Sequence, residues 1–251
     1  MGPLVSVVIP TLNEAKNLPH VFANLPPDIF EVVVVDGRST DATIEVARAL
    51  RPDVRIVRQT RRGKGDALRH GYAACRGDII VTLDADGSMD AAEITSFVDA
   101  LTMGADFAKG SRFLPGGGST DITRLRKWGN WTLMRLVNVL YGSRYSDLTY
   151  GYNAFWARLL PQLDLNCDGF AYEILVNCRI AKDELRVTEV PSRETPRLHG
   201  ASNLNAWRDG WAVLKIILHE RFIGVGASPA VTAPVLLDGL LYGDDIDGAT
   251  A

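Results

Sequence analysis

The sequence predicts an α/β fold in which helices cover both faces of a mostly parallel sheet. Two observations lead to this prediction. First, short runs rich in β-branched residues recur early in the chain, each followed by a polar turn and an amphipathic stretch. These runs, the predicted strands, cover residues 4–9, 32–35, 54–57 and 79–83. Second, Ser, Thr and Asp residues of the kind that cap helices precede the stretches at 42–50 and 91–101.

The pattern changes after residue 101. There the sequence predicts, in order, a strand at 107–113, a glycine loop at 116–118, a long helix at 122–141, a loop at 147–153, a helix at 172–181, a strand at 185–190 and a helix at 204–221. From residue 224 the composition shifts to Gly, Ala, Pro and Asp, so we expect residues 224–251 to form a flexible or weakly docked tail. Residues 1–223 are expected to form a single domain.

Size, composition and charge limit the function classes. The 251 residues exceed the roughly 150 of one compact domain, and 47% hydrophobic and 23% charged residues are ordinary globular values. A net charge of -3 argues against bulk attraction to nucleic acid or to anionic lipid, so an anionic partner has to meet a local basic patch. No apolar run reaches the roughly 18 to 20 residues that span a bilayer. The three cysteines lack Cys-x-x-Cys spacing. We therefore expect a cytoplasmic protein, soluble or peripheral to the membrane.

Two carboxylates follow the predicted strand at 79–83. Asp84 and Asp86 are separated by Ala85, and side chains two apart on an extended strand point to the same side. Carboxylate oxygens are ligands for hard divalent cations, and the ends of strands are where open α/β sheets bind ligands. The pair predicts a cation site, and the alternative is a solvated acidic turn.

Two further segments carry binding chemistry. Asp36 ends the predicted strand at 32–35, where a carboxylate can accept hydrogen bonds from a nucleobase or ribose, or cap the next helix. The segment 61–65, Arg-Arg-Gly-Lys-Gly, is interpreted as a flexible basic loop. Its glycines permit close backbone approach to a phosphate, and its cations supply charge.

These segments occur in an order that resembles family 2 of the inverting nucleotide-sugar glycosyltransferases, which have the GT-A fold. The segments that carry the resemblance are 7–14, 35–41, 63–65 and 84–86. Later segments are similar to motifs of the polyprenyl-phosphate (dolichyl-phosphate) mannose or glucose synthases of that family, namely 110–113, 147–152, 169–173 and 197–204. The resemblance implies a nucleotide-sugar half at 4–110 and, as an acceptor-side extension, an acceptor half at 111–221.

The resemblance also implies roles for individual residues. Asp84 and Asp86 would hold Mg²⁺ or Mn²⁺ on the donor diphosphate. The catalytic residues would be Asp147, Asp86 and Arg112. The nucleotide sugar would be bound by Pro10, Asn13, Glu14, Asp36, Arg38, Lys64, Asp84 and Ala85. The loop over the phosphates and the acceptor would include Arg197, His199, Ser202, Tyr172 and Glu173.

The expected reaction is transfer of a hexose from GDP-mannose or UDP-glucose to a polyprenyl phosphate. An alternative is transfer to a soluble hydroxyl acceptor, such as a specialised metabolite or glycan, and a remote one is a non-catalytic nucleotide-sugar-binding protein. A phosphate acceptor is largely dianionic at neutral pH and needs no base. A hydroxyl acceptor needs one, and Asp147 is the candidate, unless its role is to cap the following turn.

The predicted helix at 122–141 bears on the acceptor. It begins with basic residues and carries Trp128, Trp131 and a long apolar face. Such a helix can lie against anionic headgroups or line a groove for an isoprenoid chain. An ordinary core helix with a basic start is the alternative. If the acceptor is a polyprenyl phosphate, we therefore also expect peripheral contact with the cytoplasmic face of a membrane.

Overall fold

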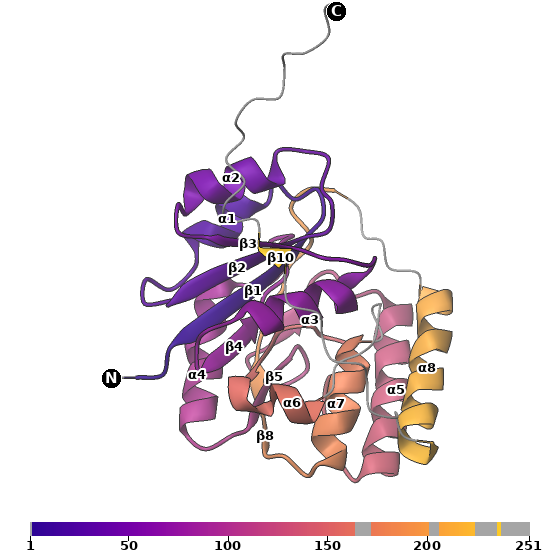
Figure 1. Cartoon of the computed structure of the whole chain (residues 1–251). Coiled ribbons are helices and arrows are strands. Elements are labelled where there is room, and N and C mark those ends of the chain that lie inside the picture. The colour runs from indigo at the N-terminus through magenta and orange to yellow at the C-terminus, as the bar shows by residue number, and fades with distance from the viewer. Residues whose placement is uncertain (1, 164–171, 201–205, 224–234, 237–251) are drawn as a thin grey trace, which may run out of the picture.

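The computed structural model describes residues 2–163, 172–200, 206–223 and 235–236 (Figure 1). Its centre is an eight-stranded sheet in the order β10-β3-β2-β1-β4-β7-β5-β8. The strands are β1 (Val5–Thr11), β2 (Glu31–Asp36), β3 (Arg55–Arg58), β4 (Ile79–Thr82), β5 (Phe107–Ser111), β7 (Asn153–Trp156), β8 (Val187–Pro191) and β10 (Val235–Leu236). Strands β1 to β4 pair in parallel, as do β5 and β8. The mostly parallel sheet predicted from the sequence is confirmed.

Helices cover both faces of this sheet, and two long helices lie beside it. The helices are α1 (Leu18–Ala23), α2 (Thr43–Leu50), α3 (Lys64–Ala74), η1 (Ala91–Glu93), α4 (Ile94–Thr102), α5 (Arg124–Tyr141), η2 (Ala157–Leu159), α6 (Leu160–Leu163), α7 (Tyr172–Lys182) and α8 (Ala206–Phe222). A second, two-stranded sheet joins β6 (Gly118–Ser119) to β9 (Arg193–Glu194). Among the described helices, none combines the length and the hydropathy of a membrane-spanning segment.

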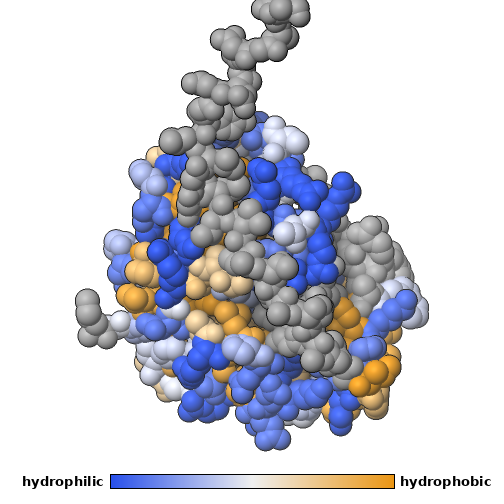
Figure 2. Space-filling model, viewed as in Figure 1, coloured by the Kyte–Doolittle hydropathy of each residue, from blue (hydrophilic) through white to orange (hydrophobic). Residues whose placement is uncertain are grey.

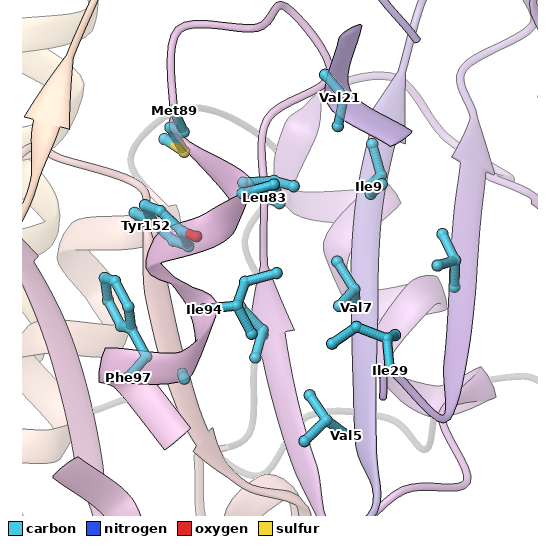
Figure 3. Packing of buried hydrophobic residues seen from close by; sticks show 14 of the residues in the cluster. Val5, Val7, Ile9, Val21, Ile29, Leu83, Met89, Ile94, Phe97 and Tyr152 are labelled. Atoms are coloured by element: carbon cyan, nitrogen blue, oxygen red, sulfur yellow. The ribbon is translucent and has the colours of Figure 1, made fainter. Parts of the chain in front are cut away.

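The core has one layer on each face of the sheet. On one face, α1, α2 and α4 pack against side chains of β1, β2 and β4 (Figure 3). There Phe97 stacks on Tyr152 with ring centroids 4.3 Å apart. On the other face, α3, α6 and α7 cover alternate side chains of the same strands. The strands read as continuous hydrophobic runs because both of their faces are buried.

A third hydrophobic cluster lies beside the sheet, between α5, α7 and α8. Its buried members include Val137 of α5, Cys178 of α7 and Ile217 of α8. Figure 1 shows α5 and α8 side by side at the lower right. This cluster attaches the two long helices to the sheet domain through α7.

One strand was missed from the sequence, and one interpretation was wrong. The loop predicted at 147–153 is present up to Tyr152, but β7, which was not predicted, begins at Asn153 and lies antiparallel between β4 and β5. The segment 61–65 was interpreted as a flexible loop, but α3 begins at Lys64, directly after Gly63 with its φ of 106°. Asp66 orders the start of this helix, because its Oδ2 accepts the backbone N–H groups of Thr60 and Arg61 at 3.1 and 2.8 Å.

The predicted tail at 224–251 is described only at Val235–Leu236. These residues form β10, which pairs antiparallel with β3. The other tail residues lie outside the described part of the chain, so the domain boundary at residue 223 stays a prediction.

The packing of Phe97 gives a test of the core. Phe97→Ala should lower the free energy of unfolding by about 3–5 kcal/mol, because a fully buried aromatic ring stacked on Tyr152 is replaced by a cavity. Chemical denaturation followed by circular dichroism measures the change. Met103→Ala is the control, because this side chain is 86% exposed and should change stability by less than about 0.5 kcal/mol. Equal stability of the two variants would contradict the packing described.

Candidate active site

The predicted binding residues converge at the carboxyl ends of β1, β2 and β4. The register of the sheet brings Thr11 level with Asp36, and Val8 level with Thr82. Leu83 continues β4 by donating its N–H to the carbonyl of Val8 at 3.0 Å. The segments that follow these strands therefore meet at one edge of the sheet, as parallel pairing requires.

Asp84 and Asp86 lie on the accessible side of the turn after β4, and the side chain of Ala85 is buried in the core between them. Their side chains are 25% and 17% exposed. Oδ1 of Asp86 accepts from the N–H and the hydroxyl of Ser88 at 3.0 and 2.7 Å. Gly87 has a φ of +75°, which turns the chain back toward this acid. The turn thus presents two carboxylates together.

Each of these acids faces a cation. Lys64 Nζ lies 2.6 Å from Asp84 Oδ1, and Arg197 Nη2 lies 3.2 Å from Asp86 Oδ2. Burial raises the pKa of Asp84 to about 6; Lys64 opposes this shift, and Asp86 and Glu173 add to it. Burial alone would lower the pKa of Lys64, but its ion pairs with Asp84 and Glu173 raise it. The ammonium therefore stays charged at neutral pH.

The turn after β2 is built around Asp36. This side chain is fully buried, and its two oxygens accept the N–H groups of Arg38 and Ser39, each at 3.0 Å. The adjacent Asn13 accepts the N–H of Thr40 at 2.8 Å. Both Asn13 and Arg38 have positive φ values, 60° and 69°. Asp36 thus fixes the turn, and its predicted contact with a base or ribose stays a prediction.

Three other residues predicted to bind the nucleotide lie around the same turns. Pro10 pairs in register with Val35 inside the sheet. Arg38 donates from Nη2 to the carbonyl of Thr60 at 2.9 Å, which joins the turn after β2 to the segment after β3. Glu14 is buried and pairs with Arg197 at 2.8 Å.

The segment at 195–199 lies over the acid pair. Thr195 donates its N–H to the carbonyl of Ser88 at 2.9 Å, and Leu198 donates to the carbonyl of Asp86 at 3.1 Å. The backbone carbonyl of His199 accepts from Asn17 at 3.2 Å, and the His199 side chain is exposed. Arg197 therefore reaches the acids from a loop that follows β9. Ser202 lies outside the described residues.

In the predicted acceptor half, Arg112 and Asp147 form a buried bidentate ion pair. Nε and Nη2 of Arg112 lie 2.7 and 2.9 Å from the two oxygens of Asp147. Nη1 reaches Glu194 at 3.0 Å, and the guanidinium lies 4.8 Å from the ring centre of Tyr150. Although burial opposes it, Arg112 and the nearby Lys109 hold the pKa of Asp147 below its usual range. The carboxylate stays ionised.

Asp147 also accepts the N–H of Thr149 at 3.3 Å, which is the turn-capping contact considered as its alternative role. Glu194 and Lys109 were missed by sequence reasoning. Lys109 is fully buried and donates to the carbonyl of Tyr150 at 2.6 Å. The predicted acceptor-loop residue Tyr172 is buried in the core cluster of α3, α6 and α7.

An apolar surface lies on α5 and α8. Trp128 and Trp131 of α5 are 64% and 51% exposed, and Trp211 and Phe222 of α8 are exposed as well. Figure 2 shows orange side chains at the lower right, over the region where Figure 1 places these two helices. Val137 of the same α5 is fully buried in the cluster beside the sheet. The helix thus has one face in the core and one exposed face, and the contact of the exposed face with lipid stays a prediction.

Comparison with known proteins identifies the family. A model of glycosyl transferase family 2 matches residues 6–162. The glycosyltransferase AglJ of Haloferax volcanii is 34% identical over 223 residues, which cover 86% of this chain and 71% of AglJ. The polyprenol monophosphomannose synthase of Mycolicibacterium smegmatis is 32% identical, with 84% of each chain covered.

The fold is that of solved glycosyltransferases. Glucosyl-3-phosphoglycerate synthase from Mycobacterium tuberculosis, in complex with Mn²⁺, UDP and glucosyl-3-phosphoglycerate, superposes with a TM-score of 0.68 at 24% identity, covering 88% of this chain and 80% of that one. This likeness confirms the GT-A fold expected from the sequence. Because the family model matches more than half of the residues, and relatives above 30% identity align along most of their length, the chain belongs to glycosyl transferase family 2.

Proposed function

We propose that this hexosyltransferase moves a hexose from a GDP- or UDP-hexose to a polyprenyl phosphate, with Mg²⁺ or Mn²⁺ held by Asp84 and Asp86. The observation that carries the proposal is the acid pair after β4, which is partly exposed and faces Lys64 and Arg197. A metal diphosphate needs carboxylates for its cation and basic side chains for its phosphates, and both kinds of group lie together there.

The residues present fit a divalent cation. Two carboxylates at one turn supply the hard oxygen ligands that Mg²⁺ and Mn²⁺ prefer. When bound, the cation would neutralise charge on the leaving diphosphate. Arg197 and Lys64 supply fixed positive charge beside the same place, which favours an anionic leaving group without reorganisation.

The burial and the hydrogen bonds of Asp147 favour a phosphate acceptor over a hydroxyl acceptor. This carboxylate is fully buried and its oxygens are engaged by Arg112 and Thr149, so it is poorly placed to take a proton from a hydroxyl. A phosphate dianion needs only to be positioned. The relative from M. smegmatis is named as a polyprenol monophosphomannose synthase, and one from Pyrococcus furiosus, 31% identical over 218 residues, as a dolichol-phosphate mannosyltransferase.

The exposed face of α5 and α8 fits the lipid part of such an acceptor. Trp128, Trp131 and Trp211 expose aromatic rings, and Arg124 and Lys127 lie at the start of α5. Aromatic and basic side chains on one helix are typical of contact with an anionic bilayer surface. We therefore propose that this face rests on the membrane that contains the acceptor, at its cytoplasmic side.

Asp86→Ala tests the metal-dependent chemistry. We expect transfer and donor hydrolysis to fall by about 100-fold or more, because the proposed metal ligand is lost and Arg197 keeps only Glu14 of the two acids with which it pairs among the described residues. Activity is measured with a saturating donor and Mn²⁺ or Mg²⁺. Asp53→Ala is the matched control, since this exposed acid pairs only locally with Arg51 and should leave turnover unchanged. Wild-type turnover in Asp86→Ala would contradict the metal-dependent mechanism proposed here.

The acceptor class is tested with labelled donors. The pure protein is incubated with radiolabelled GDP-mannose or UDP-glucose, Mn²⁺ and a membrane lipid extract, and the organic phase is counted. Label in an organic-soluble, mild-acid-labile product is expected with one of the donors. If neither donor labels the organic phase, while a soluble hydroxyl acceptor takes the label, the polyprenyl hypothesis is wrong.

Contact with the membrane is tested by placing charge on the exposed face of α5. Trp128→Glu and Trp131→Glu should lower transfer to polyprenyl phosphate in anionic vesicles several-fold, because a carboxylate is repelled by the lipid surface. Hydrolysis of the donor in the absence of lipid should not change. Met103→Glu adds the same charge at an exposed apolar residue beyond α4 and serves as the control. Equal rates in all three variants would rule out a role for this face.

A further inference from the structure

We propose that Glu173 is a positioning residue for the metal site, which acts on Asp84 through Lys64 and not by contact with the acceptor. This inference rests on the proposed function, because it concerns the cation that Asp84 and Asp86 would hold. It changes the role that the family resemblance implies for Glu173, which was placed in the loop over the phosphates and acceptor.

Lys64 joins the two carboxylates. Its Nζ lies 2.6 Å from Oδ1 of Asp84 and 2.7 Å from Oε1 of Glu173, and all three side chains are largely shielded from water. Lys64 is the first residue of α3, in the half of the chain that carries the acid pair, whereas Glu173 lies in the first turn of α7. The ammonium therefore shares its charge between a proposed metal ligand and a residue of the acceptor half.

Gly151 leaves the room that this arrangement needs. A Cβ at this position would clash with Oε1 of Glu173 and would lie 3.0 Å from Nζ of Lys64. The backbone before β7 thus packs directly against the ion pair. A Cβ at residue 151 would force the carboxylate end of Glu173, and with it the neighbouring ammonium end of Lys64, to shift, so the geometry of the pair depends in part on a third segment of the chain.

The arrangement determines how strongly Asp84 can bind a cation. Without the Glu173 carboxylate, the whole charge of Lys64 would act on Asp84 and compete with a metal ion for that carboxylate. With this carboxylate 2.7 Å from the ammonium, part of the charge of Lys64 is balanced by Glu173, and the site keeps more negative potential. A direct role of Glu173 at the acceptor is unfavourable, because a carboxylate repels a phosphate of the same sign.

The test measures metal binding directly. The free Mn²⁺ signal in electron paramagnetic resonance is titrated with wild-type and variant proteins, in the presence of saturating UDP or GDP. Glu173→Gln should weaken Mn²⁺ binding by about 10- to 100-fold, the range found when partners of metal ligands are removed. Gly151→Ala, which keeps every charge, should weaken it in the same direction. The KM for Mn²⁺ should rise in step, and the KM for the acceptor at saturating Mn²⁺ should not change.

The matched control is Glu220→Gln. Glu220 is a buried acid of α8 that pairs with Arg179 and Lys182 in the cluster beside the sheet, so its loss tests the effect of removing a buried ion pair elsewhere. Its Mn²⁺ affinity should equal that of the wild type. Glu173→Asp, with a shorter side chain and the same charge, provides a second variant if Glu173→Gln does not fold, and should show a smaller loss.

The possible results separate this inference from the function on which it rests. Wild-type Mn²⁺ affinity in the folded Glu173 and Gly151 variants, with a raised KM for the acceptor, would overturn the positioning role. A wild-type protein that binds no Mn²⁺ with either nucleotide would instead defeat the metal site of the proposed function. If the wild-type protein and Glu220→Gln bind Mn²⁺ equally well and the Glu173 and Gly151 variants bind it more weakly, the result supports both the metal site and the positioning role of Glu173.

Discussion

The ion pairs of the buried Arg112 guanidinium are the interaction on which the predicted acceptor half of the chain depends. Its Nε and Nη2 hold both oxygens of Asp147, and its Nη1 holds Glu194. These partners lie 35 and 82 residues away along the chain, so the guanidinium joins segments that are distant in the sequence. Removing one partner of such a buried pair destabilises a protein by about 3–5 kcal/mol, because the other charge is left uncompensated. A lysine could not replace this planar fork.

The same constraint orients the loop that covers the nucleotide side. Glu194 belongs to β9, and the chain continues from there to Thr195 and Arg197, which reach Ser88, Asp86 and Glu14. Arg112 therefore fixes the start of the loop, and the acids fix its far part. Ion pairs cross between the halves in both directions, since Lys64 reaches Glu173 from the nucleotide half. These ion pairs therefore join the segments predicted to form the two halves of the site.

The sequence predicts the parallel core well and the antiparallel strand poorly. Strands β1, β2 and β4 are short runs rich in Val and Ile, and each is followed by a polar turn and a helix, an alternation typical of a parallel sheet. β7 has only four residues and begins with an asparagine, and its place between β4 and β5 depends on pairing that local periodicity does not encode. In the same way, the two glycines around Lys64 indicated a loop, whereas the side chain of Asp66 orders the turn and lets α3 begin there.

Among the residues of the candidate site, too, those with a local sequence pattern could be predicted and those with distant partners could not. Asp84 and Asp86 could be found because their spacing and their place after a strand carry the chemistry. Glu194, Lys109 and Gly151 could not, since their importance comes from partners that are distant in the sequence. A glutamate in a short polar segment has no local feature that distinguishes it from a solvated acid. Only the fold shows that it faces a buried arginine.

The state of Asp147 bears on the nature of the nucleophile. A general base works best with a pKa near the working pH and with a free oxygen within hydrogen-bond reach of the proton it takes. Asp147 has neither property, because Arg112 and Lys109 hold its pKa below the usual range and its oxygens already accept from Arg112 and Thr149. Protonation would also break the buried ion pair. A phosphate monoester, with a second pKa near 6, arrives largely deprotonated and avoids this requirement. The buried, ionised Asp147 thus favours the proposal of a phosphate nucleophile, which is already deprotonated and needs no general base.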